Sequence, residues 1–523
     1  MLKPYLIATL IAETGQKEDE AMSHVGCLIY IIITDNARYH IMKLSKYIVF
    51  LAVILITISS CVDDDFSSSP DYNLQFSTDT VKFDTVFSKV PSSTRTMWVH
   101  NKSEKDLRCS NIRLLNGNQT GYRVNVDGVY LSPASGFQVQ NVEIRKNDSI
   151  RVFVELTPPR NGALEAKRLQ DKLVFRLESG NVEEIILDAF SWDAKELNHL
   201  VVTKDTTIES ESPILVNGTI KVQEGATMTI PAGQTLYFSS NSGIEVDGKL
   251  VLSGTKDKNV TLRGSRLDNM FDYLPYDLVS GQWNGIRFTG NSYDNKIEFA
   301  DIHSAMNGIV CDSSDVYKRK LNIENSIIHN CQGYGVEAIN SDLYINNSQI
   351  TNTLKDCLAI FGGKVFVGNS TIAQFYPFDS KRGAALRFSN SFNGTSLLLL
   401  SMQCVNDIIT GYSEDVMFGE PDDSENPFNY MFKSCLIRTP EVTDEKNKNF
   451  FTDVIWEEPS DTVSGGEKNF KLVDIEKQYY DFHLSGNSKA IGTASAEHST
   501  KTDRDGAERD EKPDMGCYEF KEH

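Results

Sequence analysis

One short segment of the sequence combines aromatic and acidic residues that could bind a sugar. Aromatic rings stack on the faces of pyranose rings, and carboxylates accept hydrogen bonds from sugar hydroxyls. A capping loop whose aromatic rings pack on their own protein would use the same residue types. Within and directly after residues 266–282, the candidate ligand-binding residues are Asp272, Tyr273, Tyr276, Asp277 and Trp283.

Arg287 and Glu337 complete the candidate ligand-binding residues, and they are also the candidates for acid–base chemistry if the protein cleaves a polysaccharide. A lyase needs a basic side chain beside a uronate and carboxylates that hold calcium, whereas a hydrolase needs paired carboxylates. The pair Asp422 and Asp423 lies in an acidic loop beside a proline and has no such partners. We therefore assign no catalytic residue, and we keep as the alternative a lyase or hydrolase with a site around Arg287, Glu337 and residues 266–283.

Metal-ligating residue types do not form a complete set in the sequence. His303 and His329 occupy equivalent places in a repeat, but Thr351 occupies the next such place, so a solvated histidine ladder is favoured over a metal site. Asp503 and Asp505 fit a plain turn better than a calcium loop. We predict no metal and no cofactor, with calcium as the one ion left open.

Composition excludes two further classes of protein. The 52 Lys and Arg residues against 72 Asp and Glu residues give a net charge of −20, which argues against a nucleic-acid partner. The mature body has an odd number of cysteines at irregular spacing and lacks a C-x-x-C pair, so neither a disulfide framework nor a structural zinc site is expected.

A signal peptide precedes the candidate residues. Residues 42–60 contain a short basic start, an apolar run too short to span a bilayer, and Ser59-Ser60 before Cys61. This pattern resembles a bacterial lipobox and predicts lipidation of Cys61. Residues 1–41 are then an over-extended start, and residues 61–74 form a polar tether. An uncleaved anchor with a chance cysteine is the alternative.

The elements that position the candidates are short strands. Residues 75–195 alternate apolar and polar positions between turn residues, which predicts an immunoglobulin-like β-sandwich. From residue 196 the pattern repeats: Asn325-Ser326, Asn347-Ser348 and Asn369-Ser370 recur at a spacing of 22 residues. Coils of this length with several short strands predict a right-handed parallel β-helix over residues 196–492, closed by residues 493–523. The fold class is therefore all-β.

A second family of aligned strands specifies which side chains point inward. The strands starting at Gly243, Gly285, Gly308, Gly335, Cys357 and Ala385 have apolar second and fourth positions, so these face the core and the third position faces outward. Cys311 is then a core residue rather than a nucleophile. The polar residues two places after the repeat isoleucines are expected to form an internal amide ladder; they are Ser304, Asn330, Asn352 and Gln374.

Several stretches carry a family resemblance that covers nearly all of the mature chain. They are residues 79–81, 83–87, 125–128, 227–233, 243–248, 282–286, 480–484, 488–492 and 513–519. Together they resemble lipid-anchored right-handed parallel β-helix repeat proteins of Bacteroidota, a pectate-lyase-like superfold largely without assigned chemistry. The resemblance implies an outer-membrane lipoprotein, exposed at the cell surface or facing the periplasm.

These observations favour a lipoprotein that binds a glycan or an extracellular partner along its β-helix without catalysis. The membrane, through the lipid anchor, and a polysaccharide are the expected partners. A polysaccharide lyase or glycoside hydrolase, and a structural envelope protein, are the two alternatives.

Overall fold

The structure is a computed structural model that describes residues 66–271 and 273–522. Cys61, the signal peptide, residues 1–41 and Asp272 lie outside the described residues. Strands dominate the described chain, joined by turns and a few one-turn 3₁₀ helices. Among these residues, none of the helices has the length and apolar character needed to cross a bilayer.

The first described domain is a sandwich of two five-stranded sheets with the orders β1-β3-β8-β5-β6 and β2-β10-β9-β4-β7. Neighbouring strands are antiparallel except for β10 and β2. Alternating side chains from both sheets, such as Met97, Val152 and Phe175, fill one buried core. The strands are β1 (Gln75–Phe76), β2 (Thr80–Phe87), β3 (Arg95–Asn101), β4 (Leu107–Leu114), β5 (Tyr122–Val126), β6 (Val129–Tyr130), β7 (Gln138–Ile144), β8 (Asp148–Leu156), β9 (Lys167–Leu177) and β10 (Val182–Trp192).

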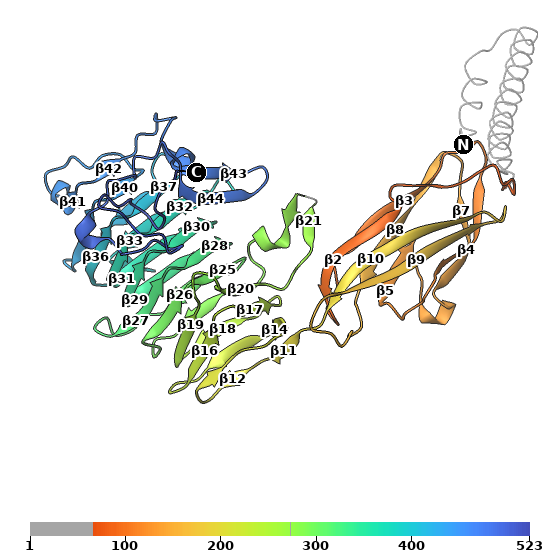
Figure 1. Cartoon of the computed structure of the whole chain (residues 1–523), viewed down its shortest axis with the longest axis horizontal. Coiled ribbons are helices and arrows are strands. Elements are labelled where there is room, and N and C mark those ends of the chain that lie inside the picture. The colour runs from red at the N-terminus through yellow and green to blue at the C-terminus, as the bar shows by residue number, and fades with distance from the viewer. Residues whose placement is uncertain (1–65, 272, 523) are drawn as a thin grey trace, which may run out of the picture. The chain divides into compact units, whose positions relative to one another are not determined.

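The following strands form a parallel β-helix, coloured from yellow to blue in Figure 1. Its 11-stranded sheet takes one strand from each coil. These strands are β11 (Lys195–Asn198), β14 (Ile214–Asn217), β17 (Thr235–Phe238), β20 (Val260–Gly264), β25 (Ala300–His303), β28 (Ile327–Cys331), β30 (Gln349–Thr353), β32 (Thr371–Gln374), β37 (Ile408–Gly411), β40 (Leu436–Ile437) and β42 (Ile455–Trp456).

A 17-stranded sheet forms the remaining walls of the β-helix, and its two ladders merge where β29 and β31 run through both. Its strands are β12 (Val201–Val202), β13 (Thr206–Thr207), β15 (Thr219–Val222), β16 (Thr227–Pro231), β18 (Gly243–Val246), β19 (Lys249–Ser253), β23 (Ile286–Phe288), β24 (Asn295–Glu298), β26 (Ile309–Cys311), β27 (Arg319–Glu324), β29 (Val336–Asn346), β31 (Leu358–Gly368), β33 (Leu386–Ser389), β36 (Leu399–Val405), β38 (Met417–Glu420), β39 (Phe428–Lys433) and β41 (Phe451–Thr452).

The predicted inward and outward alternation is confirmed. Ile244, Ile286, Ile309 and Val336 are paired in register on successive coils and are buried, as are the residues two places after each of them. Cys311 belongs to this core with no exposed surface. One continuous apolar column therefore runs along the β-helix.

The recurring Asn-Ser pairs form one corner of the coil. Asn325, Asn347 and Asn369 adopt positive φ angles of 51°, 52° and 47°, a left-handed conformation that asparagine tolerates better than most residues. The Asn347 Nδ2 donates to the Asn325 Oδ1 at 2.6 Å, and the Asn406 Nδ2 on a later coil donates to the Asn369 Oδ1 at 3.2 Å. Asn369 itself donates to Asn346 at 3.1 Å, so the corner amides form separate pairs. The expected ladder at Ser304, Asn330, Asn352 and Gln374 was wrong: these side chains are buried and bond no equivalent side chain on the next coil.

The β-helix stack ends earlier than residue 492. Its last strand is β42, and β43 (Phe470–Asp474) and β44 (Tyr479–Leu484) form a separate antiparallel pair. The C-terminal segment that follows packs on the outer face of the 11-stranded sheet, where the Tyr518 hydroxyl donates to Gln349 at 3.0 Å. The apolar residues Phe375, Phe482 and Met515 bury this contact.

Candidate functional site

The outer surface of the 17-stranded sheet carries the charged residues that the sequence singled out. The registers of β18, β23, β26, β29, β31 and β33 place one outward side chain per coil in a row, as the alignment of the repeats predicted. We call this row the charged strip; it consists of Glu245, Arg287, Val310, Glu337, Ala359 and Arg387.

Most charges of the strip have partners within the protein. The Arg287 Nε donates to Asp312 at 2.8 Å, and the Arg387 Nε donates to Asp356 at the same distance. Glu245 accepts from Lys221 at 3.0 Å. The Arg287 and Glu245 pairs are partly exposed, so their contribution to stability is small and their head groups remain within reach of a ligand, whereas Asp356 is buried beneath Arg387.

Glu337 differs from the other charges of the strip. Its half-buried carboxyl makes no hydrogen bond or ion pair within the described residues. Burial raises the pKa of Glu337, helped by the charge of Asp312 and opposed by Lys355 and Arg287. A carboxyl with this environment either accepts hydrogen bonds from a ligand or holds a proton for transfer.

Two neighbours of Glu337 were missed by the sequence reasoning. The Lys355 Nζ lies 4.7 Å from the centre of the Tyr334 ring, and burial raises the pKa of the Tyr334 hydroxyl. Neither the Lys355 ammonium nor the Tyr334 hydroxyl has a hydrogen-bond partner among residues 66–271 and 273–522. Both residues lie in the turns before β29 and β31, so an alignment of these turns with the strands would have revealed them.

The insertion between β20 and β23 has an exposed tip and a packed base. At its tip, the rings of Phe271 and Tyr273 are more than half exposed and stack on each other at a centroid distance of 5.8 Å. Tyr276, by contrast, lies against the guanidinium of Arg266, 3.9 Å from its ring centre. Of the described candidates in this loop, Tyr273 is thus the one whose ring is free to contact a ligand.

Trp283 is not part of a ligand-binding surface, contrary to expectation. Its side chain is 1% exposed and stacks on Phe238 at 4.2 Å between centroids. The indole Nε1 donates to the carbonyl of His303 at 2.8 Å. The Trp283 ring therefore completes the core of the β-helix. At this residue the alternative prediction, in which the aromatic rings pack on their own protein, is correct.

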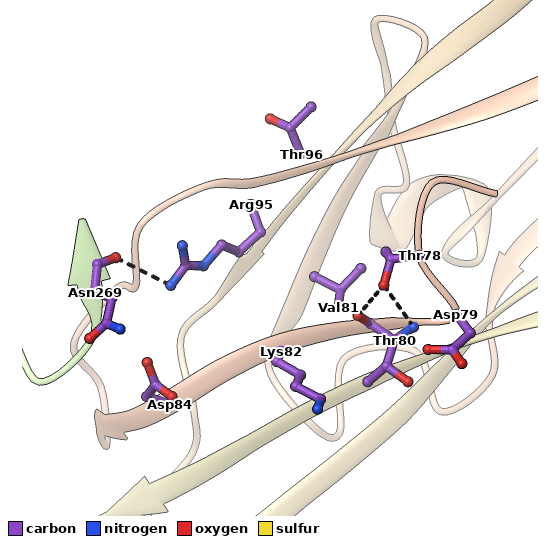
Figure 2. Close-up of a pocket in the computed structure, with 9 residues that line it drawn as sticks. All are labelled: Thr78, Asp79, Thr80, Val81, Lys82, Asp84, Arg95, Thr96 and Asn269. Atoms are coloured by element: carbon purple, nitrogen blue, oxygen red, sulfur yellow. Dashed lines mark hydrogen bonds between the residues drawn. The ribbon is translucent and has the colours of Figure 1, made fainter. Parts of the chain in front are cut away.

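A shallow polar hollow of about 500 Å³ lies beside the insertion (Figure 2). Strands β2 and β3 supply most of its lining, and Asn269 of the insertion closes one side. The Arg95 guanidinium donates to the Asn269 carbonyl at 3.3 Å, and the Ser93 hydroxyl donates to Asp268 at 2.7 Å. The insertion is therefore held by the sandwich, and the hollow is separate from the charged strip in sequence and in lining residues.

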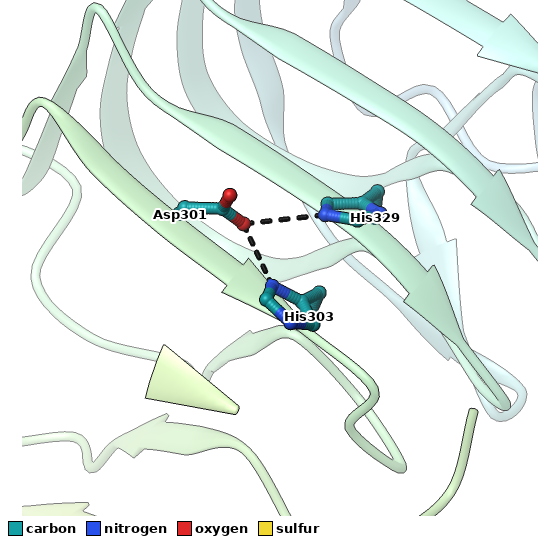
Figure 3. Close-up of side chains that lie close together, drawn as sticks. All are labelled: Asp301, His303 and His329. Atoms are coloured by element: carbon teal, nitrogen blue, oxygen red, sulfur yellow. Dashed lines mark hydrogen bonds and ion pairs between the residues drawn. The ribbon is translucent and has the colours of Figure 1, made fainter. Parts of the chain in front are cut away.

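Asp277 points toward the two histidines of the repeat. It accepts from Arg263 at 2.8 Å and pairs with the Nε2 of His303 at the same distance. His303 and His329 are in register, but they do not form a solvated ladder, since the His303 side chain is only 6% exposed and Asp301 joins the two rings (Figure 3). The alternation of Asp301 and His303 along one strand was the signal that could have revealed this partner.

The carboxylates of Asp301 and Asp277 determine the charge of the His303 ring. Although burial opposes the charged ring, Asp301 and Asp277 raise the pKa of His303 to about 9. Burial also opposes the charge of Asp301, but the two histidines hold its pKa well below the usual range.

The remaining sequence candidates have structural partners. Asp505 pairs with His483 at 3.0 Å and with Arg504 at 3.0 Å. Asp503 accepts the Ala507 N–H in a turn and the Glu519 N–H from the C-terminal segment. All seven cysteines of the described chain are buried and free of disulfides. Burial raises the pKa of each thiol, which agrees with their expected role as core residues.

Comparison with known proteins supports the fold. Residues 200–375 match the family described as right handed beta helix region. No curated protein matches the chain.

The solved structures that match the chain are remote from it in sequence and in structure. The catalytic unit of a GH87 alpha-1,3-glucanase from Streptomyces thermodiastaticus matches with 11% identity and a TM-score of 0.29, covering 69% of this chain and 88% of that chain. A family 123 glycoside hydrolase from Clostridium perfringens matches with 9% identity and a TM-score of 0.16, covering 23% of this chain and 26% of that chain. A PapD-like domain of human CEP192 matches with 12% identity and a TM-score of 0.16, covering 25% of this chain and 92% of that chain. At these identities and scores, the likenesses carry no argument about activity.

Proposed function

We propose that this protein is an envelope-anchored lipoprotein whose β-helix binds a glycan along the charged strip without cleaving it. The observation that supports this proposal is the set of polar head groups at Glu337, Tyr334 and Lys355 that have no hydrogen-bond partner in the described protein. Glu337 and Tyr334 are half-buried, and polar groups in such positions cost free energy unless they are hydrogen-bonded. Lys355 is exposed and adds a charged donor beside them, so a ligand rich in hydroxyls could satisfy donors and acceptors at once.

The charge pattern favours a neutral glycan over an acidic one. Carboxylates and basic side chains alternate along the strip, so it presents both hydrogen-bond acceptors and donors to hydroxyls. The net charge of −20 weakens the approach of a long polyanion through general repulsion. The exposed ring of Tyr273 adds a second surface on which a sugar face could stack.

Retention of the full-length protein on immobilised neutral polysaccharides tests the proposal. Replacing Glu337 by Gln, or Lys355 by Met, removes one charged hydrogen bond, and we expect about 10-fold to 100-fold weaker binding. Glu298→Gln is the matched control, because this residue lies in β24, outside the charged strip, and already pairs with Lys296. Equal retention of all variants, or none by the wild type across a broad panel, would contradict glycan binding at the strip.

Cleavage is the second candidate function, and the raised pKa of the unpaired Glu337 favours it. A carboxyl whose pKa is raised keeps its proton to a higher pH than an ordinary glutamate does, and it can then serve as a general acid toward a glycosidic oxygen. Incubation with neutral and uronate-containing polysaccharides plus calcium, followed by chromatography, distinguishes the two functions. If the wild type shortens a polysaccharide and Glu337→Gln does not, the protein is an enzyme rather than a binding protein. The chemical structure of the product ends then shows whether it is a lyase or a hydrolase. Arg287→Ala tests the second sequence candidate in the same assay.

Anchoring at the outer membrane through Cys61 rests on the signal-peptide pattern of the sequence and on the resemblance to lipoproteins of Bacteroidota. Metabolic labelling with a fatty-acid analogue should modify the wild type and leave Cys61→Ala unmodified. Protease digestion of intact cells then distinguishes surface exposure from a periplasmic location. If Cys61→Ala still partitions with membranes, the proposed lipid anchor at Cys61 is wrong. The third alternative, a purely structural envelope protein, predicts neither retention on a glycan nor cleavage products.

A further inference from the structure

We infer that Asp301, His303 and His329 form a binding site for a divalent transition-metal ion on the outer face of the 11-stranded sheet. The site is distinct from the charged strip and goes beyond glycan binding. The three residues come from two adjacent coils, β25 and β28, and point toward one another (Figure 3).

The β-helix register supplies the geometry of the site. His303 and His329 are direct cross-strand partners with ring centroids 4.8 Å apart, and Asp301 lies two residues before His303 on the same face of the sheet. The Asp301 Oδ1 lies 2.8 Å from the His303 Nδ1 and 3.2 Å from the His329 Nε2.

These separations suit a common metal ion. One ligand atom from each residue lies within 4.8 Å of the others. Ligands of a tetrahedral zinc ion at about 2.1 Å are about 3.4 Å apart, so small side-chain rotations bring all three onto one ion. Two imidazoles and one carboxylate form the ligand set of open transition-metal sites, whereas Ca²⁺ and Mg²⁺ prefer oxygen ligands.

The surroundings of His303 orient it as a metal ligand. Its second nitrogen, Nε2, lies 2.8 Å from Asp277, whose Oδ1 is also held by Arg263 at 2.8 Å. A carboxylate on the far nitrogen fixes the tautomer of a metal-binding histidine and strengthens its ligation. Asp277 belongs to the one-turn helix η2 (Tyr276–Leu278) of the insertion, so the insertion completes the site.

The site has access to solvent on one side. The side chains of His329 and Asp301 are 20% and 29% exposed, whereas the His303 side chain is buried. A bound ion would therefore keep at least one open coordination position for water or another ligand, as catalytic rather than structural zinc sites do.

Titration of the metal-free full-length protein with Zn²⁺, followed by calorimetry, tests the inference. We expect one ion per chain. His329→Ala and Asp301→Asn each remove a ligand and should weaken binding at least about 100-fold, whereas Asp277→Asn, which does not touch the ion, should weaken it about 10-fold to 100-fold. His483→Ala is the matched control, because His483 also lies between two carboxylates but has no second histidine on an adjacent strand.

Two further measurements keep the test independent of folding. Circular dichroism in chelator must show the same thermal transition for the variants as for the wild type, and X-ray absorption at the zinc edge should show two imidazole ligands in the wild type. Unchanged zinc affinity in both ligand variants, an equal loss in His483→Ala, or absence of stoichiometric binding by the wild type would overturn the site.

Discussion

Asp407 interrupts a ladder of serine hydroxyls, and replacing it by Ser should stabilise the protein. Ser326, Ser348 and Ser370 occupy the same corner of successive coils, and each hydroxyl accepts a backbone N–H from the preceding coil. Asp407 takes the next place, where its Oδ1 accepts from the Ser370 N–H at 2.7 Å. Its Oδ2 is buried and makes no hydrogen bond to the part of the chain that the structure describes, and the residue has no exposed surface.

The magnitude follows from the buried carboxyl. An unsatisfied buried polar atom costs about 1–3 kcal/mol, and a serine hydroxyl would donate to the carbonyl two residues earlier, as in the other coils. We therefore expect Asp407→Ser to raise the free energy of unfolding by about 1–3 kcal/mol near neutral pH.

The pH dependence has a definite sign. Burial raises the pKa of Asp407 well above its usual range. The contribution of the protonated carboxyl is fully present below the unfolded-state pKa and is lost as pH rises toward the folded-state pKa. Wild type should lose stability relative to Asp407→Ser across this window, by up to about 1.4 kcal/mol per pH unit.

Urea unfolding followed by tryptophan fluorescence at several pH values measures this difference. Ser348→Asp is the matched reverse change, since it introduces a carboxyl at an equivalent corner and should destabilise the protein in the same pH-dependent way. The reasoning fails if Asp407→Ser is no more stable than wild type at pH 7 and the gap between them does not widen with pH.

Three further changes test other parts of the fold. Gly285→Ala should cost at least about 3 kcal/mol in urea unfolding, because φ is +88° and an added Cβ would lie 1.6 Å from the Asn307 carbonyl oxygen; Gly394→Ala, at φ +77° with open space, should cost about 1 kcal/mol. Asn347→Ala should lower stability by about 1–3 kcal/mol in the same assay, since it removes a residue suited to positive φ and the hydrogen bond that its side chain donates to Asn325. A neutral result would contradict a stabilising role for this corner. The seven described cysteines should resist a thiol reagent in the native protein and react after unfolding, because all are buried; rapid native labelling would refute this packing.

The repeat pattern of the sequence was sufficient to predict the β-helix. Alternating apolar residues specify which side chains face the core, and equal spacing places them in register on successive coils. For this reason the outward row with Arg287 and Glu337, and the core position of Cys311, were predicted correctly. The same local logic failed for the expected amide ladder, because Ser304 and Asn330 bond carbonyl groups of the insertion instead of each other.

Other features depended on contacts between segments far apart in the chain. The sequence predicted Trp283 as a ligand-binding residue, but in the folded β-helix its ring stacks on Phe238 in the core. Asp277 contacts Arg263 and His303 only because the insertion folds back onto the 11-stranded sheet. Sequence spacing determines which residues share a face of a strand. Whether a side chain on that face meets solvent, a charge or a covering segment is decided by the tertiary structure, because covering segments arrive from outside the repeat.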